Sequence, residues 1–181
     1  MKKIKFSLLL LALCLSGYSQ DLYKVNKSTI LFFSEAPLEN IEATNSKAQG
    51  LINLATKKFA FIVPIVEFNF EKSLMEEHFN ENYMESAKFK TGSFNGDIIT
   101  EENFKKDGTY EVEVSGILTI HGVTKERTIK GILTKNKEAL SIVSEFDVAL
   151  ADYNIKIPKM VIKNIAENVQ VKVDLSFELK K

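Results

Sequence analysis

The chain has 181 residues, of which 45% are hydrophobic, with 24 basic and 24 acidic residues, two histidines, one cysteine and no tryptophan. This even charge balance argues against nucleic acid or an anionic membrane surface as the main partner. A single cysteine excludes a disulfide framework and a zinc site built from cysteines. The length and apolar fraction suit one globular domain that can bury a core of its own.

The first nineteen residues have the pattern of a secretory signal peptide. Three lysines within the first five residues precede the apolar run 6–15, which is too short to cross a bilayer comfortably. Small residues predict cleavage before Gln20, and Cys14 lacks the small preceding residue that lipoprotein processing needs. We therefore expect residues 20–181 to form one exported domain, periplasmic or secreted, without a stable membrane anchor. Loss of three of the 24 basic residues would give it a formal charge of −3.

Alternation of apolar and polar residues recurs along the rest of the chain. It is clearest at 169–179 and at 110–116, and it predicts strands with one buried and one solvent-facing side. Segments 29–33 and 58–68 are apolar on both faces. Further strand candidates are 50–54, 89–100 and 140–150. About eight antiparallel strands with short turns favour an all-β barrel or sandwich, and closure into a barrel removes exposed edges.

One segment departs from this alternation. Between Ser73 and Ser86 the apolar residues fall at helical spacing, with glutamates on the other side. Ser73 and Glu76 have the spacing of an N-terminal capping box. We predict one short helix over about 73–85 that covers a face or mouth of the barrel, and a weaker helical turn over 40–47.

Neither histidine has the partners of a catalytic or metal site in the sequence. His78 has glutamates nearby but no second histidine four residues on. His121 lies in a turn, where we expect its imidazole to hydrogen-bond the turn backbone; it could titrate near neutral pH, but the sequence indicates nothing for it to gate. Nucleophile elbows, phosphate loops and dinucleotide fingerprints are absent. We expect no catalytic residues, no metal and no cofactor.

The chain is rich in phenylalanine, with 13 in all and 12 after residue 19. These rings could fill a solid core. Some could instead line an elongated apolar cavity, because an eight-stranded barrel is wide enough to hold one ligand along its axis. The composition leaves both alternatives open.

The most specific stretch is a predicted hairpin at 116–128. Its core, Leu118-Thr119-Ile120-His121-Gly122-Val123-Thr124-Lys125, resembles the signature hairpin of the YceI-like family. Further similarity lies at 23–32, 68–86, 89–96 and 152–158. An Arg-Asp pair frequent in the central segment is replaced here by Leu74-Met75 and His78-Phe79, and the first strand lacks a frequent His-Ser pair. If either element holds a ligand's head group, this chain binds a different head group or none.

The resemblance implies an eight-stranded, antiparallel, lipocalin-like barrel that carries or stores a long isoprenoid chain, such as a polyprenyl quinone or polyprenyl phosphate. Burial of each methylene group would contribute about 0.8 kcal/mol, so such a tail needs few polar contacts. On this hypothesis eight residues form the apolar wall of the cavity: Phe32, Phe61, Phe94, Leu118, Ile120, Phe146, Val171 and Val173. Met75, Phe79 and Tyr83 form a helical lid whose methionine can adapt to the ligand's shape.

Other hypotheses make different structural demands. The domain could be an exported interaction or stress-response module, a β-sandwich or barrel with a filled core and no lipid ligand. A hydrolase would need a histidine beside a nucleophile or clustered carboxylates. Two copies could also pair as a homodimer. A continuous apolar tunnel through the barrel would favour the lipid-binding hypothesis.

Overall fold

The computed structural model describes residues 21–158 and 163–180, so the predicted signal peptide lies outside the described residues. The strands are β1 (Leu22–Glu35), β2 (Asn40–Asn45), β3 (Gln49–Asn53), β4 (Lys58–Pro64), β5 (Phe68–Phe70), β6 (Thr91–Ile99), β7 (Gly108–Ile120), β8 (Val123–Asn136), β9 (Ala139–Ala149) and β10 (Asn168–Leu179). The helical elements are η1 (Ile65–Glu67), α1 (Ser73–His78), the π-helical η2 (Phe79–Tyr83) and η3 (Leu150–Tyr153). No helix in this part of the chain is long and apolar enough to span a membrane.

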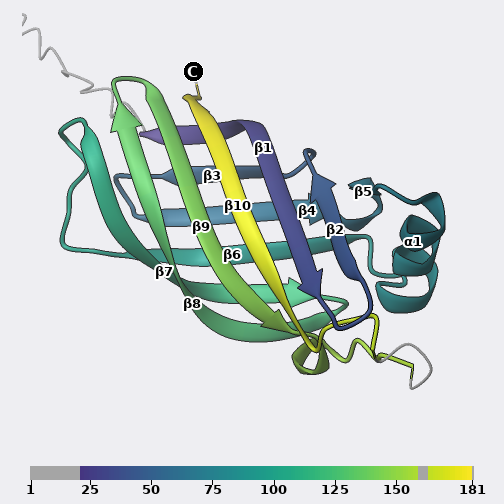
Figure 1. Cartoon of the computed structure of the whole chain (residues 1–181). Helices are drawn as coiled ribbons and strands as arrows, with labels where there is room; N and C mark the ends of the chain where they lie inside the picture. The colour runs from purple at the N-terminus through teal and green to yellow at the C-terminus, as the bar shows by residue number, and fades with distance from the viewer. Residues whose placement is uncertain (1–20, 159–162, 181) are drawn as a thin grey trace, which may run out of the picture.

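The strands form one antiparallel sheet that closes on itself (Figure 1). Their order is β10-β9-β8-β7-β6-β4-β3-β1-β2-β5, and β10 also pairs with β1. The two ends of β1 pair with β3 and β2 respectively, so β2 and β3 are parts of one broken strand. The same holds for β4 and β5, which η1 separates. The ten described strands thus occupy eight positions, which confirms the predicted all-β, lipocalin-like barrel.

The break in these strands opens one corner of the barrel. β4 pairs with β6 along its whole length, whereas β5 pairs with β2 and has no pairing with β6 among the described residues. The chain between β5 and β6 forms α1 and η2, which lie at this end of the barrel (Figure 1). The missing strand contact therefore places the helical segment at the barrel mouth.

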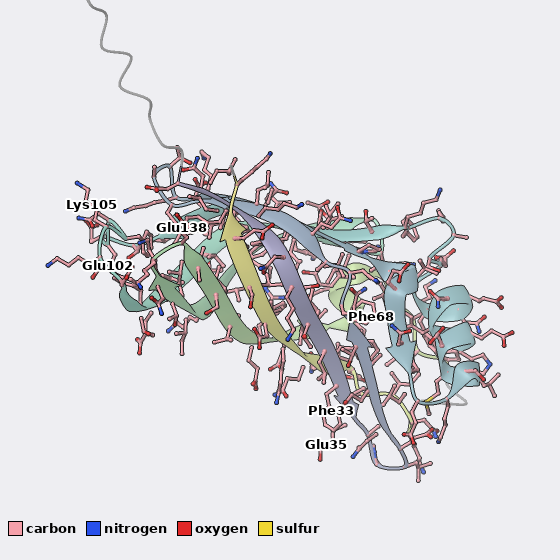
Figure 2. The ribbon with its side chains drawn as sticks, turned by 90° about the horizontal axis from the view of Figure 1, so that it is seen from above. Phe33, Glu35, Phe68, Glu102, Lys105 and Glu138 are labelled. Carbon is pink, nitrogen blue, oxygen red and sulfur yellow. The ribbon has the colours of Figure 1, made fainter. Side chains whose placement is uncertain are left out.

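The opposite end of the barrel is filled by side chains. Glu102, Lys105 and Glu138 mark this end in Figure 2. In the β6–β7 loop, Phe104 is only 3% exposed and packs edge-on against Tyr110, with ring centroids 5.2 Å apart. The buried residues here form what we call the basal core: Tyr23, Val25, Ile52, Leu54, Phe59, Ile98, Phe104, Val112, Leu133, Leu140, Leu175 and Phe177. Closure at this end leaves the α1 end as the way into the barrel.

A pair of glycines lets β6 and β7 approach closely. Gly96 and Gly116 are opposite each other in an unbroken register. A Cβ on Gly96 would lie 2.5 Å from the Cα of Gly116, so neither position accommodates a side chain. The two glycines thus mark a close backbone contact between β6 and β7 without a bulge.

Two local predictions are wrong. Residues 40–45 form strand β2 rather than a helical turn. Ser73 is the first helical residue of α1 and Lys72 is its N-cap, with no side-chain capping bond. Glu76 instead accepts a hydrogen bond from the backbone N–H of Phe70, at the adjacent end of β5, at 3.2 Å. The predicted short helix is present as α1 followed by η2.

Candidate functional site

The inward-facing side chains change from buried to half-exposed and back along single strands. On β10, Val169 and Leu175 are 9% and 4% exposed, whereas Val171 and Val173 between them are only half-buried. β9 repeats this change around the half-buried Phe146. Protein interiors are normally close-packed, so accessible inward surface in the middle of a strand borders an internal space. The centre of the barrel is hollow.

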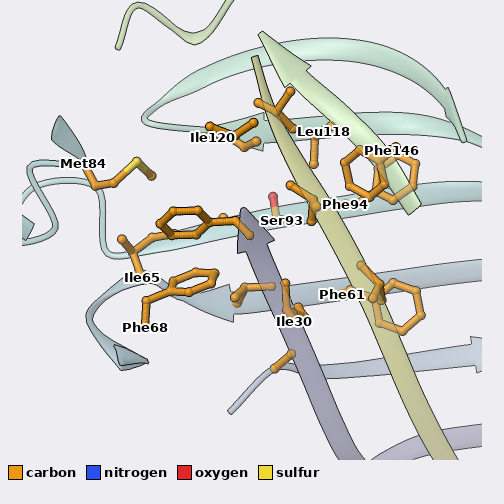
Figure 3. A pocket seen from close by; sticks show the side chains of 18 of the residues that line it. Ile30, Phe61, Ile65, Phe68, Met84, Ser93, Phe94, Leu118, Ile120 and Phe146 are labelled. Carbon is orange, nitrogen blue, oxygen red and sulfur yellow. The ribbon is translucent and has the colours of Figure 1, made fainter. Parts of the chain in front are cut away.

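The hollow is an apolar cavity of about 440 Å³ between the basal core and the α1 end. Small-molecule sites typically measure about 300–1,000 Å³. Figure 3 shows Phe61, Phe94 and Phe146 arranged around it with Leu118 and Ile120. The wall also includes residues that were not assigned to it from the sequence: Ile30, Val63, Ile65, Phe68, Phe70, Met84, Val114 and Ile142. The alternation that indicated their neighbours could have found Ile30, Val114 and Ile142.

All eight residues assigned to the wall from the sequence border this cavity: Phe32, Phe61, Phe94, Leu118, Ile120, Phe146, Val171 and Val173. Their side chains face the same space because the registers contain no one-residue slip between these positions. Their contact with a ligand stays a prediction.

We call residues 73–86 the lid, because this segment covers the α1 end of the cavity. Phe79 stacks on Phe32 at 5.4 Å between ring centroids, and also contacts Phe68 and Phe70 at 5.6 and 5.0 Å. This aromatic cluster packs the lid against the barrel.

The three residues predicted for the lid, Met75, Phe79 and Tyr83, all border the cavity. Their contact with a ligand likewise stays a prediction.

Charged groups at the cavity are confined to its rim in the described part of the chain. The rim includes Glu39, whose Oε1 lies 2.8 Å from Nζ of Lys72. The hydrogen bond to Glu39 raises the pKa of Lys72, and burial raises the pKa of Tyr83, so the cation and the neutral phenol are both favoured. An apolar chain fits the interior without desolvating a charge, whereas a charged group must stay at the rim.

His121 joins the β7–β8 hairpin to the lid. Its Nδ1 lies 3.1 Å from the backbone oxygen of Tyr153 in η3, and its Nε2 lies 2.8 Å from Oε2 of Glu85. The prediction that this ring bonds the backbone of its own turn is therefore wrong. Phe89 packs edge-on against the ring, and Gly122, with φ of 72°, leaves room for it: a Cβ there would lie 2.4 Å from the Phe89 ring. Through His121 and Gly122, the β7–β8 hairpin thus contacts η3, Phe89 and the end of the lid.

The second histidine has a simpler environment. His78, the last residue of α1, is exposed and lies at the rim of the cavity. Across residues 21–158 and 163–180, no group of three or more histidine, cysteine or carboxylate side chains could hold a metal ion.

Known proteins share this architecture. Residues 23–177 match the sequence model of the YceI-like domain. A polyisoprenoid binding domain from Saccharophagus degradans, implicated in plant cell wall breakdown, superposes with a TM-score of 0.76 at 14% identity, covering 87% of this chain and 98% of that one. Burkholderia cenocepacia BcnA gives 0.69 at 16% identity, with 82% and 95% covered, and a Campylobacter jejuni YceI protein gives 0.58 at 15%, with 75% and 81% covered. No curated protein matches the chain. At such identities the structural likeness shows the fold.

Proposed function

Because this chain belongs to the YceI-like family, we propose that it binds one long isoprenoid-type lipid inside its barrel, for carriage or storage. The related domain from S. degradans is described as polyisoprenoid binding, which supports a lipid ligand. The observation that carries the proposal is the apolar cavity of about 440 Å³ where a filled barrel would have buried side chains. The same cavity counts against an interaction module with a filled core.

The shape of the site favours binding through the lipid tail. The basal core closes one end, so the tail enters from the lid end with its free end innermost. Each buried methylene contributes about 0.8 kcal/mol to the binding free energy, and the apolar wall requires no polar contact from the tail. Burial of the ligand's tail would therefore supply most of the binding free energy. Such binding needs no catalytic group.

The head group would remain at the rim, near His78 and Glu39. A polyprenyl quinone or a polyprenyl phosphate could bind in this way, because the polar head keeps its contact with water. We also propose that the domain is exported, periplasmic or secreted, after removal of residues 1–19. Mass analysis of the protein from each cell fraction tests that part, since the exported form should begin at Gln20.

Competition binding tests the proposed ligand class. The full chain is loaded with the fluorescent apolar probe N-phenyl-1-naphthylamine, which is displaced by prenols and prenyl quinones of increasing length. Affinity should rise by about tenfold or more with each added isoprene unit until the cavity is full, and then level off. A quinone without a tail should not displace the probe. Displacement that ignores tail length, or no displacement by any isoprenoid, would overturn the proposal.

A further inference from the structure

The lid is tied to the barrel by polar contacts at both of its ends. Near its start, Glu76 accepts the N–H of Phe70, a neighbour only six residues away in the chain. Near its end, Glu85 meets His121, which is 36 residues away on the β7–β8 hairpin. The first contact lies beside the point where the lid leaves β5, which is paired with β2, so it can persist while the far end of the lid moves. The second must break if the lid is to leave the hairpin.

The two hydrogen-bond partners of His121 can both accept a hydrogen from the ring only when both ring nitrogens carry one. The backbone oxygen of Tyr153 and the carboxylate of Glu85 are both hydrogen-bond acceptors, and each faces one ring nitrogen. A neutral imidazole carries a hydrogen on one nitrogen only, so it would present a lone pair to one of these oxygens. The imidazolium donates to both. The contact is therefore complete only when His121 is charged.

The surrounding charges leave Glu85 as the anion in direct contact with the ring. From η3, Asp152 lies 4.0 Å from Lys125 of the hairpin itself. From the segment after the lid, Lys88 lies over the ring of Phe89, with Nζ 4.6 Å from the centroid. The side chain of His121 is 10% exposed and that of Glu85 is 47% exposed, so the pair is open to solvent on the Glu85 side. Bulk protons can therefore reach it.

The backbone conformation at Glu85 and at His121 positions both side chains for this contact. Glu85 and His121 have positive φ angles, 43° and 49°, a conformation that residues other than glycine adopt at some cost. The carbonyl of Glu85 accepts the N–H groups of Lys88 and Phe89 at 2.8 and 2.9 Å, which turns the chain sharply at the end of the lid. This turn presents the Glu85 side chain to the hairpin.

We propose that the Glu85–His121 contact is a proton-operated latch that keeps the lid closed over the cavity. When His121 is protonated, both hydrogen bonds form, the bond to Glu85 is charge-assisted and the lid is held. When the ring loses the proton, one bond is lost and in either tautomer the Glu85 contact loses its charge attraction, so the lid opens more often. What passes the lid rests on the proposed function, whereas the latch itself concerns only the lid and the hairpin. Exchange of bound lipid would thus be faster in mildly alkaline solution, at about pH 8, than in mildly acidic solution, at about pH 5.

Two variants separate the latch from a merely structural contact. Glu85→Gln offers both a donor and an acceptor, so it can pair with Nε2 in either protonation state and should hold the lid at any pH in this range. His121→Asn keeps a residue that tolerates positive φ but removes the ring, and should release the lid at any pH. Glu81→Gln is the matched control, because it removes the same charge from an exposed position on the lid.

Hydrogen–deuterium exchange in the full chain reads the latch without any lipid. The amides of Met84 and Ser86 bond to the carbonyls of Phe79 and Asn80 at 2.8 Å each, within the lid itself, so they report opening by local unfolding at the end of the lid that Glu85 anchors. After correction for intrinsic exchange rates, opening in the wild type and in Glu81→Gln should be about three- to tenfold more frequent at about pH 8 than at about pH 5. Glu85→Gln should lose this dependence.

The outcomes are distinct for the latch and for lipid binding. If Glu85→Gln keeps the pH dependence of the wild type, or His121→Asn leaves lid exchange unchanged, the latch is overturned even where lipids bind. If lid exchange follows the latch and no isoprenoid displaces the apolar probe, the latch stands and the proposed function fails. Should His121→Asn not fold, the comparison of Glu85→Gln with Glu81→Gln still decides.

Discussion

Phe79 of the lid and Phe32 of β1 stack with their ring centroids 5.4 Å apart and their planes inclined by 21°. Phe68 and Phe70 complete the cluster from β5. Three elements that are separate in the chain therefore meet at the mouth of the cavity. Aromatic packing holds the lid by its apolar side, and the Glu85–His121 contact holds it at its far end.

Replacing Phe79 tests how firmly the aromatic cluster seats the lid. Because this side chain is half-buried and touches three rings, Phe79→Ala should lower the free energy of unfolding by about 2 kcal/mol, less than for a fully buried ring. Leu74→Ala changes an apolar side chain of the same helix that is 59% exposed, and should stay within about 0.5 kcal/mol of the wild type. Denaturant unfolding compares them, and equal losses would contradict the assigned packing.

The same substitution at two depths tests whether the barrel is hollow. Val171→Phe places a ring in the cavity, so the free energy of unfolding should change by less than about 1 kcal/mol while apolar probe binding falls at least about tenfold. Val112→Phe overpacks the basal core, where Val112 is 5% exposed, and should cost about 1–3 kcal/mol. Unfolding curves and probe titrations on both variants give the answer. A large stability loss for Val171→Phe would mean that the space is already filled.

The hairpin turn should be intolerant of a side chain at Gly122. Gly122→Ala combines a φ of 72° with a Cβ 2.4 Å from the Phe89 ring, so we expect a loss of about 1–3 kcal/mol in the free energy of unfolding. A Cβ on Gly108 would meet its nearest atoms at 3.5 Å, an ordinary contact, so Gly108→Ala should be nearly neutral. Thermal unfolding measures both, and a neutral Gly122→Ala would argue against the tight packing around His121.

Asp107 should contribute to the acid dependence of stability. Its carboxylate accepts the backbone N–H of Lys137 at 2.9 Å and a hydrogen from Nζ of Lys135 at 3.2 Å, and these contacts lower its pKa below the ordinary 3.8. The stabilisation is therefore present above the ordinary pKa and is lost as the pH falls through the lowered one. Asp107→Asn should reduce stability at neutral pH and flatten the acid limb of a stability profile from urea unfolding. An unaltered acid limb would contradict this assignment.

The parts of the fold that follow from period-two alternation could be predicted from the sequence. Segment 169–179 shows this most clearly, because an amphipathic strand in a closed barrel must turn its apolar side inward. Phe94 and Phe146 could be placed on the wall for the same reason. The hairpin around Gly122 could also be predicted, because a glycine between two alternating runs predicts a turn.

The features that depend on distant neighbours could not be predicted. Segment 40–45 is short and largely polar, and it forms a strand because it pairs with β1 on one side and with β5 on the other. Glu76 accepts the N–H of Phe70 instead of capping α1, and this contact depends on where β5 ends against β2, which the local pattern does not indicate. The pairing of Glu85 with His121 depends on two positive φ angles and on barrel closure, neither of which has a local sequence signal. The hollow centre is likewise a property of the closed sheet.

Native mass spectrometry of the protein purified from its own host tests the central claim most directly. We expect a species heavier than the bare chain by the mass of one lipid, and organic extraction should release a single molecule with an isoprenoid tail. Val171→Phe should carry less of it than the wild type, because the ring occupies the cavity. A chain that is consistently free of lipid, including after incubation with isoprenoid quinones, would contradict the claim that this barrel is a lipid carrier.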